Sequence, residues 1–314
     1  MKIIMSILLI LLILAAFMSN MIGKKFLKNF RRKNPGEKFT EDIDISFYLN
    51  GPLKKIAEQG VAYMETLPHE EVYITSRDGL KLHATYFPAE NNSKNIVIGI
   101  HGFQSVAWNE YAPHIAFYRS IGFGMLLPDD RGHAYSEGEY ITMGVKDRLD
   151  CVDWAKYAVD RFGEDVRLLL HGVSMGGATV LSASGEEDLP KQVLGIVSDC
   201  GFSSVKEAFA FQIKTMYHVN PGLILNICQW FAKHKAGFDF MEARPIDQVK
   251  KAKVPILFVQ GAEDFLVPRE MAERLYEACS SPKKLLIVEK ASHAESIALD
   301  PEAYHQAIHD LFKI

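Results

Sequence analysis

The chain has 314 residues, a formal net charge of −4 and 48% hydrophobic residues, values typical of a folded globular protein. The weakly acidic balance argues against a nucleic-acid-binding protein, because such proteins normally carry a basic face. The four cysteines are far apart and form no C-x-x-C pair, so the sequence predicts neither a metal cage nor a dense disulfide framework. We therefore expect free thiols and no bound nucleic acid.

The N-terminal segment differs from the rest of the chain. Ile3 to Ile22 is a run of twenty residues that only two serines and one asparagine interrupt. As a helix it would be roughly 30 Å long, enough to cross the hydrocarbon core of a bilayer. We predict an uncleaved membrane anchor over residues 1–23. The alternatives are a cleaved signal peptide, which would have a shorter apolar core, and a buried core helix, which would have a polar face.

A cluster of cations follows the apolar run. We interpret residues 24–65 as a basic linker and an N-terminal extension of short amphipathic pieces, with a helix-breaking cluster at Asn34-Pro35-Gly36. The positive-inside rule then places the C-terminal domain in the cytoplasm, with the extracellular face as the alternative. Six cations lie within ten residues: Lys24, Lys25, Lys28, Arg31, Arg32 and Lys33.

Strand and helix signals alternate from residue 66 to the C-terminus, which we assign to one α/β domain. The turn signal Arg77-Asp78-Gly79 predicts a hairpin between the first two strands. A hairpin that leads into strands separated by helices predicts a mostly parallel sheet with helices on both faces. Eight strands are expected: 71–75, 80–87, 95–100, 124–127, 166–170, 193–197, 254–260 and 284–288. Helices are expected at 108–119, 145–162, from 175, at 271–278 and at 301–312.

Residues 202–248 interrupt this alternation. Two apolar helical segments, 205–216 and 222–231, follow the sixth predicted strand with no strand between them. We predict a small helical cap inserted over the sheet. Most of its large apolar residues should pack the cap itself, and any that face the sheet would favour an acyl chain over a charged peptide.

Gly172-Val173-Ser174-Met175-Gly176 follows a predicted buried strand and opens a predicted helix. In a tight strand-to-helix turn, a side chain two residues before or after the serine would collide with its surroundings, which explains both glycines. The turn lifts the hydroxyl clear of the sheet edge, and the helix N-terminus behind it favours an oxyanion. We predict that Ser174 is a nucleophile; the alternative is a glycine-rich turn with a chance serine.

A serine nucleophile needs a base, and eleven histidines are available. Asp264 and His293 fall in loops just past the seventh and eighth predicted strands, where an open α/β sheet places its site. We predict His293 as the base and Asp264 as the acid that orients it. Two carboxylates remain alternatives to Asp264: its neighbour Glu263, and Asp199 after the sixth strand.

An oxyanion formed at Ser174 needs two N–H donors. We expect one from Met175, directly after the nucleophile, and the other from Phe103 in the loop after the third strand, with Gln104 as the second choice. We interpret His101 as a structural histidine that bonds loop carbonyls.

The sequence predicts no cofactor and no metal. It contains neither a P-loop nor an H-E-x-x-H motif, and Gly122-Phe123-Gly124 lacks the third glycine of a dinucleotide fingerprint. His305 and His309 share one face of the last predicted helix without a third ligand, so we expect them on a solvated surface.

These motifs, in their order and spacing, resemble the α/β-hydrolase superfamily over about residues 70–314. Within it, the chain is similar to the bacterial membrane-bound "cell surface hydrolase" group, related to dipeptidyl-peptidase-like hydrolases. The resemblance implies a serine triad at Ser174, Asp264 and His293, no cofactor, and structural roles for Arg131 and His133. The group's name implies an outward-facing domain, against the charge pattern. The motifs are His101-Gly102, Asp130-Arg131-Gly132-His133-x-x-Ser136-x-Gly138, Gly172-x-Ser174-x-Gly176, Gly261-x-x-Asp264-x-x-Val267-Pro268 and Ser292-His293.

Three functions fit this set of residues. The first is hydrolysis of a carboxylic ester, thioester or amide through an acyl-enzyme on Ser174, with a small acyl compound, which could be lipid-like, as the substrate. The second is acyl transfer by the same triad to an alcohol or thiol. The third is a binding module that kept the fold without catalysis, although a lost triad residue would be its mark and none is lost. The sequence does not indicate an oligomeric state.

Overall fold

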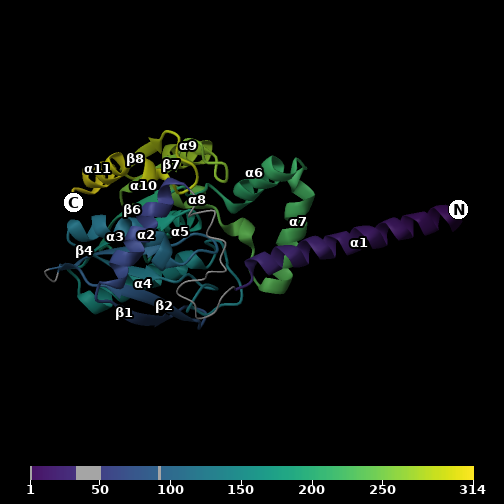
Figure 1. Ribbon diagram of the computed structural model, residues 1–314. Helices are drawn as coiled ribbons and strands as arrows, with labels where there is room; N and C mark the ends of the chain where they lie inside the picture. Colours follow the sequence, from purple (N-terminus) through teal and green to yellow (C-terminus); the bar gives the residue numbers. More distant parts are fainter. Residues whose placement is uncertain (1, 33–50, 91–92) are drawn as a thin grey trace.

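The centre of the molecule is an eight-stranded sheet in the order β1-β2-β4-β3-β5-β6-β7-β8. The computed structural model describes residues 2–32, 51–90 and 93–314, with residues 2–12 described by their backbone (Figure 1). β2 runs antiparallel to both β1 and β4, and all other neighbours are parallel. The predicted hairpin and parallel sheet are therefore confirmed. The strands are β1 (Glu70–Thr75), β2 (Lys81–Phe87), β3 (Asn95–Ile100), β4 (Phe123–Pro128), β5 (Arg167–Val173), β6 (Val193–Asp199), β7 (Ile256–Gly261) and β8 (Lys283–Val288).

Helices cover both faces of the sheet (Figure 1). Along β3, Ile96 and Ile98 pack in the core with α4 and α5, whereas Val97 packs in the core with α2, α3 and α11. A strand buried on both faces needs apolar residues at every position, which explains its continuous β-branched run. The helices are α2 (Pro52–Glu65), α3 (Ala107–Ser120), α4 (Asp147–Phe162), α5 (Met175–Ala183), α8 (Pro245–Gln248), α9 (Arg269–Ala278), α10 (Ser296–Leu299) and α11 (Pro301–Phe312).

The predicted cap is present between β6 and β7. It consists of α6 (Val205–Tyr217) and α7 (Pro221–Phe231), followed by short helical turns at Ala232–Ala236, Phe240–Glu242 and Val249–Lys251. Its buried residues, among them Phe202 and Phe240, form one apolar cluster with Met175 beside the predicted nucleophile. The cap therefore lies over the part of the sheet that carries the site.

The N-terminal helix α1 (Lys2–Phe30) continues beyond residue 23, where the sequence predicts a basic linker. The reason is the spacing of Ile22, Phe26 and Phe30, which at i, i+4 and i+8 form one apolar face that packs against the cap cluster. The basic residues of this stretch lie on the rest of the helix surface. In the part of the chain that the structure describes, no helix is both long and apolar enough to cross a membrane. The predicted helix-breaking cluster at 34–36 lies outside the described residues.

The expectation that His305 lies on a solvated surface is wrong. Its ring stacks on Phe117 of α3 at a centroid distance of 3.8 Å and an interplanar angle of 3°, because α11 packs beside α3 on the same face of the sheet. His309 is half-buried and contacts the same phenyl ring edge-on. Both histidines therefore belong to a helix–helix contact.

Candidate active site

Ser174 lies at the sharp turn between β5 and α5, with a φ of +56° that side chains rarely adopt. A Cβ atom at Gly172 would lie 2.1 Å from the carbonyl oxygen of Gly176, and one at Gly176 would lie 1.9 Å from that of Ile100. Both neighbours are backbone atoms that cannot move aside. The glycines therefore permit the turn that holds the Ser174 side chain partly exposed above the sheet.

His293 joins the two other predicted site residues. Its Nε2 lies 2.8 Å from Ser174 Oγ, and its Nδ1 lies 2.8 Å from Asp264 Oδ2. A carboxylate only accepts, so Nδ1 donates to Asp264, and Nε2 is left to accept the serine proton. The structure thus brings together side chains from three loops at the carboxyl ends of β5, β7 and β8.

Asp264 is fixed by its own loop. Its Oδ1 accepts hydrogen bonds from the backbone N–H groups of Leu266 and Val267, at 2.9 and 2.8 Å. Its Oδ2 accepts a further bond from the Gln260 side chain at 2.9 Å, in addition to the bond from His293. The carboxylate side chain is fully buried, so these four donors replace the water it would otherwise bind.

The pKa of His293 lies above the ordinary value for histidine. Burial lowers this pKa, but the charge and hydrogen bond of Asp264 raise it, with smaller contributions from the Asp199 and Glu110 carboxylates. The neutral imidazole is the form that can accept a proton from Ser174.

This shift predicts how the reactivity of Ser174 depends on pH. The rate of labelling by a fluorophosphonate should rise with pH, because His293 must lose its proton, and the midpoint should lie above about 6.5, the ordinary histidine pKa. The measurement is the labelling rate between about pH 5 and pH 9, corrected for hydrolysis of the probe. A rate that does not change with pH, or a midpoint below that of free histidine, would contradict the role of His293.

The two rival carboxylates are placed elsewhere. Glu263 is exposed to solvent. Asp199 is buried and hydrogen-bonded to Tyr304, and burial raises the pKa of this carboxyl to about 7. A carboxyl that is partly protonated near neutral pH is a weaker partner for a histidine cation than a carboxylate that stays ionised. The geometry therefore favours Asp264.

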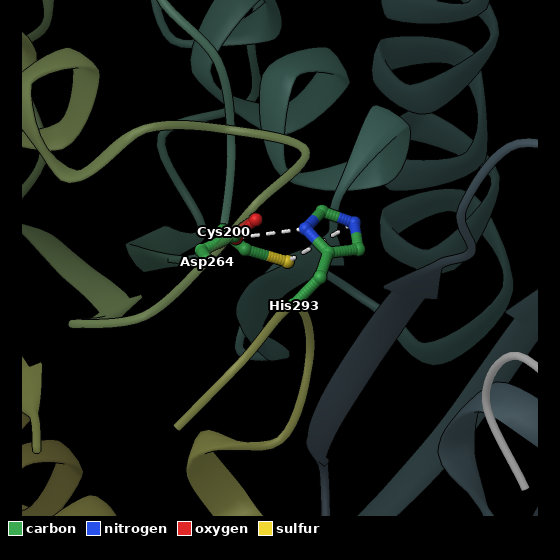
Figure 2. Close-up of side chains that lie close together, drawn as sticks. All are labelled: Cys200, Asp264 and His293. Carbon is green, nitrogen blue, oxygen red and sulfur yellow. Dashed lines mark hydrogen bonds and ion pairs between the residues drawn. The ribbon is translucent and has the colours of Figure 1, made fainter. Parts of the chain in front are cut away.

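Cys200 was not anticipated from the sequence, yet it lies in the same cluster (Figure 2). Its Sγ atom is 3.8 Å from His293 Nε2, the atom that also faces Ser174. Cys200, Asp264 and His293 offer three potential metal ligands within 4.8 Å of one another. However, His293 Nδ1 and Asp264 are bonded to each other, and burial raises the pKa of the Cys200 thiol well above its usual value, whereas metals bind the thiolate. The donor set therefore fits an acid–base pair better than a metal site.

Of the two predicted oxyanion donors, Met175 directly follows Ser174 in the chain, and Phe103 lies in the loop after β3. The N–H of Met175 begins α5, whose first-turn N–H groups have no partner within the helix. In the loop after β3, the N–H of Gln104 donates to His133 Nε2 at 3.2 Å. Because the Gln104 N–H is already bonded, it is excluded as the second oxyanion donor, and the N–H of Phe103 is the remaining candidate in that loop.

The histidines and the arginine of the neighbouring motifs support this loop. His101 is fully buried; its Nδ1 donates to Gly102 O, and its Nε2 accepts from the Asp130 N–H. Arg131 donates bidentate bonds to Asp150 and bonds Asp78 as well. The predicted structural role of His101 is confirmed, and Arg131 is held in ion pairs with Asp78 and Asp150.

The end of α1 contacts the same loop, a feature that the sequence analysis missed. The ring of Phe30 lies 5.1 Å from that of Phe103, and Gln104 Nε2 donates to Asn29 O at 2.6 Å. The i, i+4 spacing of Phe26 and Phe30 indicates an apolar helix face, but nothing in the sequence indicates which surface that face covers.

The strand order, the serine turn and the cap define an α/β-hydrolase. The chain belongs to the prolyl oligopeptidase family of serine hydrolases, whose sequence profile matches residues 113–312. The α/β-hydrolase fold with an eight-stranded, mostly parallel sheet, expected from the sequence, is therefore confirmed.

Two relatives and two solved structures illustrate the similarity. The chain is 25% identical to YqkD of Bacillus subtilis over 225 residues, covering 72% of this chain and 73% of YqkD. It is 26% identical to the membrane protein YNL320W of Saccharomyces cerevisiae over 236 residues, which cover 74% of this chain and 76% of YNL320W. The esterase Pf2001 of Pyrococcus furiosus superposes with a TM-score of 0.66 at 22% identity, and the match covers 90% of this chain and 98% of the esterase chain. An acylaminoacyl peptidase of Pyrococcus horikoshii superposes with a TM-score of 0.60 at 18% identity, and the match covers 82% of this chain and 44% of the peptidase chain. At these identities the two structures show a common fold.

Proposed function

We propose that the protein hydrolyses a carboxylic ester through an acyl-enzyme on Ser174. The observation that carries this proposal is the continuous hydrogen-bonded chain from Asp264 through His293 to the Ser174 hydroxyl, with 2.8 Å at both steps. This is the arrangement in which a base activates a serine and a third group orients the base.

The reaction proceeds in two halves. Ser174 Oγ attacks the ester carbonyl while His293 Nε2 takes its proton, and the N–H groups of Met175 and Phe103 bind the oxyanion. Collapse breaks the bond to the alcohol, which leaves with the proton from His293. Water then attacks the acyl-enzyme with His293 again as base, which releases the carboxylic acid and restores the serine.

The surroundings of Ser174 support an acyl substrate. Phe103, Phe202, Phe209 and Val267 belong to one apolar cluster with Met175, and this cluster extends under the cap. Such a surface gains free energy by covering an acyl chain. A peptide amide is the second candidate, and the match to a peptidase family favours it.

The experiment that separates these candidates uses the full chain in detergent. We expect turnover of p-nitrophenyl esters of graded chain length to exceed turnover of the matching acyl p-nitroanilides by more than about a hundredfold, since the leaving group is better and the site is apolar. Rates for aminoacyl p-nitroanilides that equal or exceed the ester rates would instead support a peptidase.

We further propose that residues 1–23 anchor the protein in a membrane, with the domain of residues 66–314 on the cytoplasmic side. The twenty-residue apolar run, the cations that follow it, and the yeast relative described as a membrane protein support this proposal. Retention in the membrane pellet after carbonate extraction, and digestion of the domain only when protease reaches the cytoplasmic face, are the expected results. Digestion from the outer face would support the opposite orientation.

A further inference from the structure

A groove of about 530 Å³ runs between α1 and the cap helices α6 and α7. This volume is within the range of sites for small organic ligands. One wall carries Ile22, Phe26 and Phe30 of α1, and the facing wall carries Phe209, Ile213 and Ile224 of the cap. The walls are aliphatic and aromatic, so the groove is suited to an extended apolar ligand.

The two walls are held in a fixed relationship. Helices α1 and α7 cross so closely that a Cβ atom at Gly23 would lie 2.1 Å from the ring of Phe231. Beyond the helix, Arg31 pairs with Tyr140 in a β-bridge, and the N–H of Arg32 donates to Glu139 O at 2.8 Å. Thus α1 is a part of the cap region rather than a loose tether, as Figure 1 shows.

The inner end of the groove is lined by residues that contact the loops of the candidate active site. Phe30 and Phe209 line the groove and contact each other edge-on at 5.8 Å, and Phe30 also contacts the ring of Phe103 in the oxyanion loop. Gln212, another lining residue, donates to Leu266 O in the loop that holds Asp264. A chain lying in the groove would therefore point its end toward the loops around Ser174.

The outer end of the groove is surrounded by exposed apolar side chains. The end of α6 contributes Met216 and Tyr217 to the groove lining, the turn before α7 contributes Val219, and all three are exposed. Figure 1 shows α1 running past α7 and away from the domain. Clustered exposed apolar side chains mark surfaces that contact a partner or a membrane. Among the side chains of α1 that the structure describes, from residue 13 onward, the large apolar residues that are more than half exposed are Ile13, Leu14, Phe17, Met18 and Met21.

Cations lie along the α1 side of the groove. Lys25 lines the groove, and Lys24 and Lys28 are exposed on neighbouring positions of α1. Basic residues beside a membrane-embedded segment attract anionic lipid headgroups. The chemistry around the groove, which is apolar with a cationic rim, matches a lipid.

We propose that the groove between α1 and the cap binds the acyl chain of a lipid ester that enters from the bilayer. This inference rests on the proposed ester hydrolysis at Ser174 and on the proposed anchor. It assigns α1 a second role, because the helix that holds the protein at the membrane also forms one wall of the substrate site.

The test uses the full chain in nanodiscs that contain anionic lipid. The substrates are p-nitrophenyl palmitate, carried in the discs, and water-soluble p-nitrophenyl acetate. Ile224→Trp fills the groove from α7, so we expect kcat/KM for palmitate to fall at least tenfold and that for acetate to change by less than about twofold. Ile213→Trp should give the same selective loss from α6, so the test does not depend on the folding of one variant.

Leu223→Trp is the matched control, because this neighbour of Ile224 on α7 is 72% exposed and does not line the groove. It should leave both rates unchanged. Equal losses for palmitate and acetate in the groove variants, or no loss for palmitate, would overturn the assignment of the groove. A wild-type protein inactive on both esters would instead overturn the proposed hydrolysis, and the inference with it.

The route from the bilayer has a separate readout. Palmitate ester placed in the same disc as the protein should be turned over at least tenfold faster than the same amount supplied in protein-free discs. Equal rates would mean that the ester reaches the groove from water.

Discussion

Replacement of Ser174 by alanine is expected to abolish fluorophosphonate labelling and to lower kcat for esters by a factor on the order of 10⁵. In the proposed reaction the hydroxyl attacks the carbonyl, and the strained turn that presents it depends on the two glycines beside it. The residual rate would come from the oxyanion donors and from substrate binding. The measurement is a steady-state assay with p-nitrophenyl esters, together with gel detection of the labelled protein.

Cys200→Ala is the matched control for this experiment. Its thiol is the second nucleophilic atom near His293 Nε2, at 3.8 Å against 2.8 Å for the serine. Cys200 is buried, and burial raises the pKa of its thiol, so it should contribute no reactive thiolate. We expect Cys200→Ala to keep labelling and most of the activity. Labelling that persists in Ser174→Ala and disappears in Cys200→Ala would assign the nucleophile to the cysteine.

The second large loss of activity is expected for the replacement of Asp264, the predicted acid. Asp264→Asn should lower kcat about 10⁴-fold, because an amide at this position no longer holds the tautomer of His293 in which Nε2 accepts the serine proton. It should also lower the pKa of His293, since Asp264 supplies the strongest contribution that raises it. The measurement is kcat and the pH dependence of labelling for the purified variant, with thermal unfolding to show that it folds.

Asp199→Asn provides the comparison within the same cluster. Asp199 is buried, but its carboxyl bonds Tyr304, and burial raises its pKa to about 7, so it is partly neutral in the native protein. Replacing it by the neutral amide should cost less than about tenfold in kcat. A loss as large as that of Asp264→Asn would show that Asp199 is the acid that orients His293, the alternative that the sequence left open.

Local sequence patterns predict most of this fold and the location of the site. The β-branched run of β3 predicts a strand because a strand buried on both faces needs apolar residues. The turn signal between β1 and β2 predicts their hairpin because the turn needs a glycine at a positive φ. Gly172 and Gly176 identify the serine turn for the same reason: backbone atoms occupy the space of a side chain.

The features that the sequence did not predict depend on contacts between distant segments. Cys200 lies near His293 only because β6 and β8 end at the same edge of the sheet. His305 has the spacing of a surface residue, yet α11 packs beside α3 and covers it. Phe30 has a helical apolar pattern, but its partner Phe103 is far along the chain. Periodicity shows that a face is apolar, and only the fold decides what covers it.

The hydrogen bond from Gln104 to Asn29 has a practical consequence for the study of this protein. Deletion of the first 33 residues is the obvious way to obtain a more soluble protein for assays. It would also remove Phe26 and Phe30, uncover the apolar side of the cap, and release the support under the loop of Phe103. Chain-length preferences measured on such a shortened protein would describe a wider, open cleft, and a weak preference there would not reflect the selectivity of the intact chain.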